Sequence, residues 1–107
     1  MREKTIKELI EKIFQERGIK VNKIILFLFG SRAKGKHRKE SDWDLLIIIN
    51  QELSREKKLE ISHLIRRGLA ERFIPCDVLI KSEKEVEKRK EVIGSIIKTA
   101  IKEGVVL

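Results

Sequence analysis

The chain has 107 residues, enough for a single domain over residues 1–107 with one modest hydrophobic core. A formal net charge of +8 and an isoelectric point near 9.8 favour polyanionic partners, although the lysines and arginines are spread along the whole chain. The lone Cys76 excludes an internal disulfide, and with only two histidines the sequence holds no zinc-binding set.

Two features bear on the cellular setting. No apolar stretch approaches the roughly 18 residues of a membrane span, and residues 1–7 lack the apolar core of a signal peptide, so we expect a cytoplasmic protein that contacts no membrane. Charged residues make up 39% of the chain, while Gln, Asn, Cys and Met are scarce. This balance is typical of heat-stable proteins and favours a thermophilic source.

The first half of the chain is expected to form one helix and two buried strands. Apolar residues at helical spacing predict a helix with Thr5 as a candidate cap and Gly18 at its end. The apolar run that follows predicts a strand from about residue 21 to 29, and a second strand is predicted for residues 42–50.

A helix and a third strand are expected next. Ser54 should begin the helix, and Pro75 precedes a strand predicted for residues 77–80. The apolar side of this helix comprises Ile61, Leu64, Ile65, Leu69 and Phe73.

The C-terminal region is predicted to form one long helix and a short edge strand. Ser82 and Glu85 have the spacing of a capping box, which marks the start of the helix, and Gly104 ends it before residues 105–107. Its charged first half should be solvated, and its apolar second half should pack into the core or meet a partner. The helix carries Val86, Ile93, Ile96, Ile97, Ala100 and Ile101.

Gly30 and Ser31 come directly after the first predicted strand. A glycine there lets the backbone approach a ligand closely, and the free N–H groups of a helix beginning at Ser31 would attract a phosphate. Taken alone, the pair could equally be an ordinary strand-ending turn, where Gly and Ser are common.

Two carboxylates stand at the entry to the second predicted strand. Side chains two residues apart share a face of a strand, so Asp42 and Asp44 point the same way and Trp43 points the other way, where we expect it to pack inward. Neighbouring carboxylates repel each other unless a cation neutralises them or one keeps its proton. Mg²⁺ prefers oxygen ligands together with waters and substrate phosphates, so the pair suits nucleotidyl transfer, although Asp42 could also be a turn cap.

The string GSRAKGKHRKESDWDL, residues 30–45, resembles the motif of the DNA polymerase beta superfamily of nucleotidyltransferases, in which Gly-Ser is followed ten residues later by Asp-x-Asp. The short length resembles its minimal nucleotidyltransferase (MntA-like) branch. This resemblance implies a polymerase-beta-like α/β fold, α+β in strict terms, with a small mixed β-sheet flanked by helices.

The resemblance also implies roles for individual residues. Gly30 and Ser31 would hold the triphosphate of ATP, and Asp42 and Asp44 would bind two Mg²⁺ ions. The family has a third carboxylate on the next strand, and Asp77 occupies that place, where it would complete the metal site and help to activate the attacking hydroxyl.

A basic run lies between the two halves of the motif. Arg32 and Lys34 are placed to reach the triphosphate, whereas the outer residues could meet an acidic partner or nucleic acid, or the run could simply be a solvated loop. No aromatic residues interleave with these cations, so binding to single-stranded bases is not favoured.

The resemblance implies an enzyme that transfers a nucleoside monophosphate, AMP from ATP, to a hydroxyl acceptor and releases pyrophosphate. We expect another protein to bring the acceptor, and the resemblance implies a tyrosine of a helical HEPN toxin, with this chain as the antitoxin. Two alternatives remain open, namely a non-catalytic binding module that restrains a helical partner by contact, and nucleotidyl transfer to a small molecule.

Overall fold

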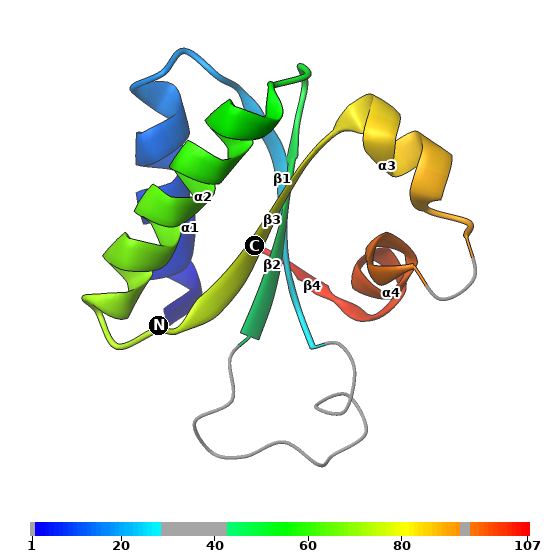
Figure 1. Cartoon of the computed structure of the whole chain (residues 1–107). Coiled ribbons are helices and arrows are strands. Elements are labelled where there is room, and N and C mark those ends of the chain that lie inside the picture. The colour runs from blue at the N-terminus through cyan, green and yellow to red at the C-terminus, as the bar shows by residue number, and fades with distance from the viewer. Residues whose placement is uncertain (1, 29–42, 93–94) are drawn as a thin grey trace.

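The structure is a computed structural model that describes residues 2–28, 43–92 and 95–107. Within these ranges, helices and strands are joined by short connections (Figure 1). The elements in chain order are α1 (Arg2–Gln15), β1 (Val21–Phe27), β2 (Trp43–Ile49), α2 (Arg55–Ala70), β3 (Cys76–Ser82), α3 (Glu83–Arg89), α4 (Ile96–Glu103) and β4 (Val105–Val106).

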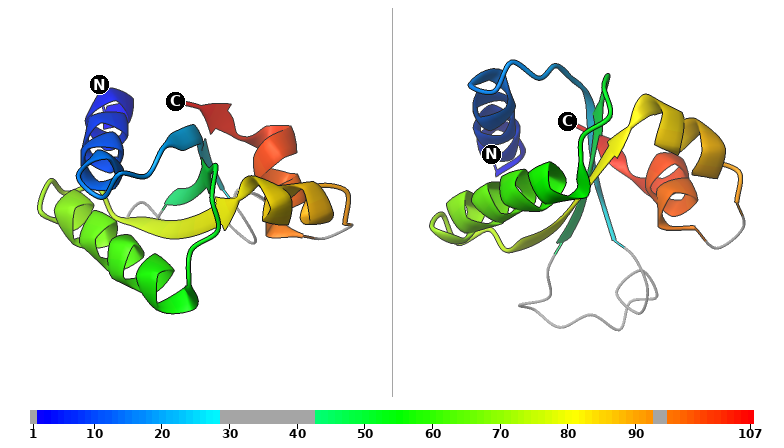
Figure 2. Two further views of the ribbon diagram at one scale, coloured as in Figure 1. Left: turned by 90° about the horizontal axis from the view of Figure 1, so that it is seen from above. Right: turned by 45° about the horizontal axis from the view of Figure 1, so that its top comes forward.

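The strands form one mixed sheet with the order β3-β2-β1-β4. β1 is antiparallel to both β2 and β4, whereas β2 and β3 are parallel and are connected through α2. Helices α1 and α2 cover one face of the sheet, and α3 and α4 cover the other (Figures 1 and 2). The small mixed sheet flanked by helices, as predicted from the sequence, is confirmed.

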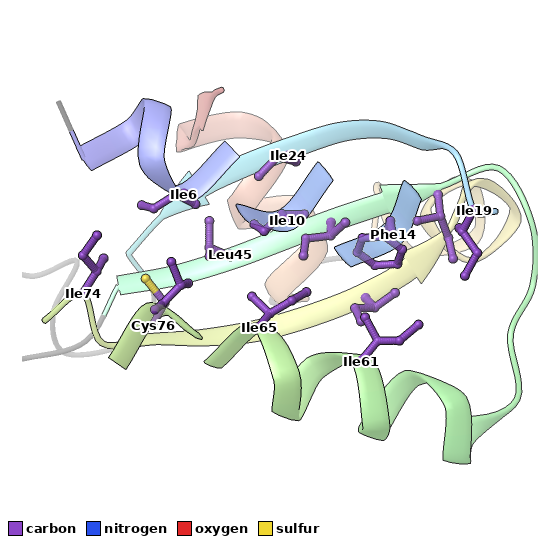
Figure 3. Packing of buried hydrophobic residues seen from close by; sticks show 14 residues of the cluster. Ile6, Ile10, Phe14, Ile19, Ile24, Leu45, Ile61, Ile65, Ile74 and Cys76 are labelled. Carbon is purple, nitrogen blue, oxygen red and sulfur yellow. The ribbon is translucent and has the colours of Figure 1, made fainter. Parts of the chain in front are cut away.

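Strand β2 is the centre of the core, because its residues from Leu45 to Ile49 are all buried. Burial on both faces explains why this strand is a continuous apolar run. On the α1/α2 face, isoleucines of both helices pack against the sheet together with Phe14, and Ile74 and Cys76 belong to the same cluster (Figure 3). A second cluster on the opposite face comprises Ile25, Phe27, Leu46, Ile48, Val86, Ile97 and Ala100.

Several of the predicted helix boundaries are confirmed. Gly18 follows α1 with a φ of 68°, a backbone conformation that glycine adopts without strain. Ser54 caps α2 by accepting a hydrogen bond from the Lys57 N–H, and Ser82 and Glu85 form the capping box of α3. Gly104 ends α4, and the short strand after it pairs with β1 at the sheet edge.

The prediction of one long C-terminal helix is wrong, because the structure has α3 and α4 as separate helices. Ser95 begins α4, where its hydroxyl accepts a hydrogen bond from the Lys98 N–H at 3.0 Å and donates one to the Arg89 carbonyl at 3.0 Å. The prediction of Thr5 as a cap is also wrong, since α1 already begins at Arg2.

Phe73 does not lie on the buried side of α2, contrary to the prediction. The helix ends at Ala70, and Phe73 has a φ of 60° with 83% of its surface exposed. This left-handed residue reverses the chain so that the Ile74 N–H donates to the Leu69 carbonyl at 2.9 Å. Ile74, and not Phe73, therefore fills the core at the end of α2.

None of the helices in the ranges that the structure describes is long and apolar enough to cross a lipid bilayer.

Candidate active site

Asp44 and Asp77 lie side by side at one end of the sheet. Asp44 is the second residue of β2 and Asp77 is the second residue of β3, and the two are direct partners in the parallel register. On its other side Asp44 is opposite Phe27, the last residue of β1. The three residues form one row across the sheet, and adjacent strands are about 4.8 Å apart, so both carboxylates can reach a single cation or phosphate.

Both carboxylates belong to the sheet face that α3 and α4 cover. Leu46, two residues after Asp44, is buried in the cluster on that face, and Leu79, two residues after Asp77, packs against the same cluster. Because residues two apart share a face, Asp44 and Asp77 lie on it too. Asp44 is half-buried and Asp77 is exposed, so the pair opens toward solvent.

The connection through α2 is what brings these residues together. The chain leaves β2, forms α2, and returns in the same direction as β3, which starts beside the start of β2. The Trp43 N–H donates to the Pro75 carbonyl at 3.4 Å at this end of the ladder. A slip by one residue would move Asp77 to the other face of the sheet and the buried Cys76 and Ile80 out of the core, so the register of β3 fixes the site as well as the core.

The donor set of the pair fits a hard divalent cation. Two carboxylates supply only oxygen ligands, and Mg²⁺ is commonly bound through one or two carboxylates plus waters and substrate phosphates. Within the described ranges, no group of three or more His, Cys, Asp or Glu side chains could hold a metal ion. A further carboxylate would have to come from outside these ranges.

The other predicted site residues lie outside the described residues. They are Gly30, Ser31, Arg32, Lys34 and Asp42.

Trp43 does not pack inward as predicted, because 44% of its surface is exposed. It shares a row with the buried Cys76 on β3. On the other side, however, β1 ends at Phe27, opposite Asp44. Trp43 is therefore one row beyond the last residue of β1 and lacks a neighbour from that strand.

A cleft of about 430 Å³ on the same face was not foreseen from the sequence. It is lined by Leu79 and Lys81 of β3, Glu85, Lys88 and Arg89 of α3, and Ser95, Ile96 and Ile97 at the start of α4. Leu79 and Lys81 continue along β3 from Asp77, so the cleft begins about 7 Å from the carboxylate pair at 3.3 Å per residue. These residues come from three separate elements, and no local motif in the sequence marks them.

Glu85 is the acidic group of this cleft, and its charge is well compensated. Partial burial would raise the pKa of Glu85, but the hydrogen bond from the Lys58 ammonium, the Ser82 N–H and the charges of Lys58 and Lys81 outweigh it and lower the pKa from 4.5 to about 2. Lys81 Nζ lies 3.9 Å from the carboxylate. Glu85 is therefore ionised at neutral pH and is neutralised by its own neighbours.

The family model "Polymerase beta, Nucleotidyltransferase" matches residues 8–107. The chain belongs to the polymerase beta nucleotidyltransferase family. The row of Asp44 and Asp77 lies at the sheet end where β1 ends at Phe27 and β2 begins at Trp43.

This nucleotidyltransferase also resembles a solved structure described as the crystal structure of the toxin-antitoxin with AMP-PNP. The TM-score is 0.52 and the sequence identity is 17%, over 91% of this chain and 68% of the other. At this identity the likeness shows a shared fold. None of the curated proteins matches the sequence significantly.

Proposed function

We propose that this nucleotidyltransferase transfers AMP from ATP to a hydroxyl of a partner protein, in a reaction that depends on Mg²⁺. The acceptor is a tyrosine of a helical HEPN-type toxin, and the chain is the antitoxin of the pair. The observation that carries the proposal is the Asp44–Asp77 row on one sheet face of a polymerase beta family member.

The roles of the residues follow from their chemistry. Asp44 and Asp77, together with Asp42, would hold Mg²⁺, which would supply positive charge to the phosphates and lower the pKa of the attacking hydroxyl. Gly30 and Ser31 hold the triphosphate through backbone N–H groups and the serine hydroxyl. Arg32 and Lys34 add positive charge beside the same phosphates. The roles of Asp42 and of these four phosphate-binding residues are assigned from the sequence motif.

The reaction is a displacement at the α-phosphorus of ATP. The hydroxyl oxygen of the acceptor forms a bond to this phosphorus, and the bond from the phosphorus to the oxygen bridging to the β-phosphate breaks. Pyrophosphate leaves with that electron pair, and the hydroxyl proton passes to a carboxylate or to solvent. Asp77 is exposed beside Asp44, and we assign to it the positioning of the acceptor hydroxyl.

The nucleotide and the partner are supported by the structural neighbour, whose description names a toxin-antitoxin with AMP-PNP. An adenine nucleotide and a protein partner are the substrates that such an assembly would bring together. The absence of aromatic residues among the described cleft residues agrees with a protein acceptor, since single-stranded nucleic acids are usually held by base stacking.

The test is to incubate the protein with ATP labelled at the α-phosphate, Mg²⁺ and the product of an adjacent gene as the candidate helical partner. Label should appear on a tyrosine of the partner, and Asp44→Asn and Asp77→Asn should each reduce incorporation by at least about a hundredfold. Glu8→Gln, which removes an exposed carboxylate of α1 on the other face, is the matched control and should leave incorporation unchanged.

Two results would contradict the proposal. Incorporation that persists in both aspartate variants would show that the row is not the active site. Neutralisation of the toxin by Asp44→Asn and Asp77→Asn without any label on the partner would favour a binding module that acts by contact.

A further inference from the structure

The cleft beside the carboxylate pair combines an apolar floor with unmatched positive charge. Leu79, Ile96 and Ile97 supply the apolar side chains. Lys88 and Arg89 are exposed at the end of α3, and neither forms an ion pair with another described residue. The cleft is thus suited to a ligand that is apolar in one part and anionic in another.

The acidic residue of the cleft does not cancel this charge. Both carboxylate oxygens of Glu85 accept hydrogen bonds from Lys58, at 2.8 Å and 3.0 Å, and Lys81 is its second cation. With Glu85 satisfied by these two lysines, the charge left for a ligand is that of Lys88 and Arg89.

The cleft is aligned with the carboxylate pair through β3. Asp77, Leu79 and Lys81 are alternate residues of this strand and share one face. The strand rises about 3.3 Å per residue, so Leu79 and Lys81 lie about 7 Å and about 13 Å from Asp77. An extended polypeptide has the same rise per residue, so every second residue of a bound segment can lie beside Asp77, Leu79 and Lys81 in turn.

The geometry points to the cleft as the binding site for the acceptor segment of the partner protein. The segment is an extended polypeptide whose hydroxyl-bearing residue lies at Asp44 and Asp77, with an apolar residue two positions away over Leu79 and an acidic residue about four positions away beside Lys88 and Arg89. This inference rests on the proposed function, because it assigns the acceptor of the same reaction.

A polypeptide fits the cleft better than a nucleic acid does. Anionic phosphates would satisfy Lys88 and Arg89, but bases stack on aromatic side chains, and the described lining of the cleft contains no aromatic residue. Aliphatic walls with charge at one end match an apolar side chain followed by a carboxylate.

The test uses two fluorescein-labelled peptides and the whole chain. In the first peptide, glycines separate a tyrosine, a leucine two positions away and a glutamate four positions away; in the second, lysine replaces glutamate. Each peptide is synthesised in both sequence orders, once with the tyrosine first and once with the tyrosine last. Binding is followed by fluorescence polarisation with Mg²⁺ and a non-hydrolysable ATP analogue present. In one of the two sequence orders, the glutamate peptide should bind at least about tenfold more tightly than the lysine peptide.

The double variant Lys88→Gln/Arg89→Gln should weaken binding of the glutamate peptide by about tenfold, through the loss of two charge contacts. Lys7→Gln/Lys12→Gln removes two exposed cations of α1 on the other face and should leave the affinity unchanged. All four substituted positions are exposed, and circular dichroism checks that both variants fold.

Three outcomes would overturn the inference. They are equal affinity for the glutamate and lysine peptides, equal affinity of Lys88→Gln/Arg89→Gln and the unchanged protein, and displacement of the peptide by a ten-nucleotide oligoadenylate that binds more tightly. Binding of the ATP analogue with Mg²⁺ is measured separately on the same samples. A lack of binding of the ATP analogue would count against the proposed function. The preference for the glutamate peptide over the lysine peptide alone decides the inference about the cleft.

Discussion

Lys58 on α2 and Glu85 on α3 form an ion pair, with the ammonium 2.8 Å and 3.0 Å from the two carboxylate oxygens. β3 is the last strand on this side of the sheet, and the two helices lie on opposite faces (Figure 1). The pair therefore joins the two helical layers directly.

We expect Glu85→Gln to destabilise the protein at neutral pH and much less in acid. The folded pKa of Glu85 is lowered from 4.5 to about 2, so its contribution is present above pH 4.5 and is lost as the pH falls toward 2. Glutamine can still serve in the capping box, so the substitution mainly removes the charge. Allowing for partial exposure, we expect a loss of about 1–2 kcal/mol at pH 7.

Urea unfolding at steps between pH 7 and pH 2.5 measures this effect. The difference in the free energy of unfolding between the unchanged protein and Glu85→Gln should shrink steadily below pH 4.5. Glu8→Gln, on the exposed side of α1, is the control and should show no such trend. A difference that stays constant across the range would mean that the carboxylate charge is not what stabilises the fold.

Phe73→Gly should raise the free energy of unfolding by about 0.5–1 kcal/mol. Phe73 has a φ of 60°, which costs most residues about 1–2 kcal/mol but costs glycine nothing. Since 83% of the side chain is exposed, little packing is lost. Phe73→Ala keeps the backbone strain and should not raise the free energy of unfolding. Thermal unfolding of the two variants measures the difference, and an equal stabilisation by alanine and glycine would contradict the role of backbone strain.

Gly104→Ala should destabilise the protein by about 2 kcal/mol or more. A Cβ at this position would lie 2.3 Å from the Ile25 side chain and 2.5 Å from the Ala100 carbonyl oxygen, and the latter belongs to backbone that cannot move aside easily. Gly68→Ala is the matched control, because its Cβ would meet only the flexible Leu9 side chain at 2.9 Å within a helix that favours alanine. The melting temperature should fall for the first variant and stay within a few degrees for the second.

Mg²⁺ together with a non-hydrolysable ATP analogue should raise the melting temperature of the unchanged protein. A ligand at a hundredfold excess over its Kd adds about 2.7 kcal/mol to the free energy of unfolding. Asp44→Asn and Asp77→Asn should lose most of this shift, and chelation of Mg²⁺ should abolish it in every variant. A full shift in the presence of a chelator would argue against a metal at the row of carboxylates.

Features that depend on neighbouring residues could be predicted from the sequence. The caps at Ser54 and Ser82, the turn at Gly18 and the end of the last helix at Gly104 each follow from a few adjacent side chains and the backbone groups that they satisfy. The buried strands were recognisable because apolar runs of this length suit the centre of a sheet.

Features that depend on distant residues could not be predicted in the same way. The break at Ser95 was missed because Ile93 and Ile96 keep a helical spacing across it, and only the cap shows that the helix restarts. Phe73 was missed for a similar reason, since it follows Leu69 by one helical turn. The pairing of Asp44 with Asp77 is a matter of strand register, which the sequence suggested only through a family resemblance.

The parallel register of Asp44 and Asp77 fixes the spacing of the two carboxylates independently of the helices that cover their face of the sheet. Their spacing is set by hydrogen bonds between two backbones, so it does not depend on the side chains of α3 and α4. Substitutions in these two helices can therefore alter which molecule reaches the carboxylates without moving the carboxylates themselves. A library that varies the cleft residues of α3 and α4 would thus show which molecules the cleft can bind while the carboxylate pair stays in place.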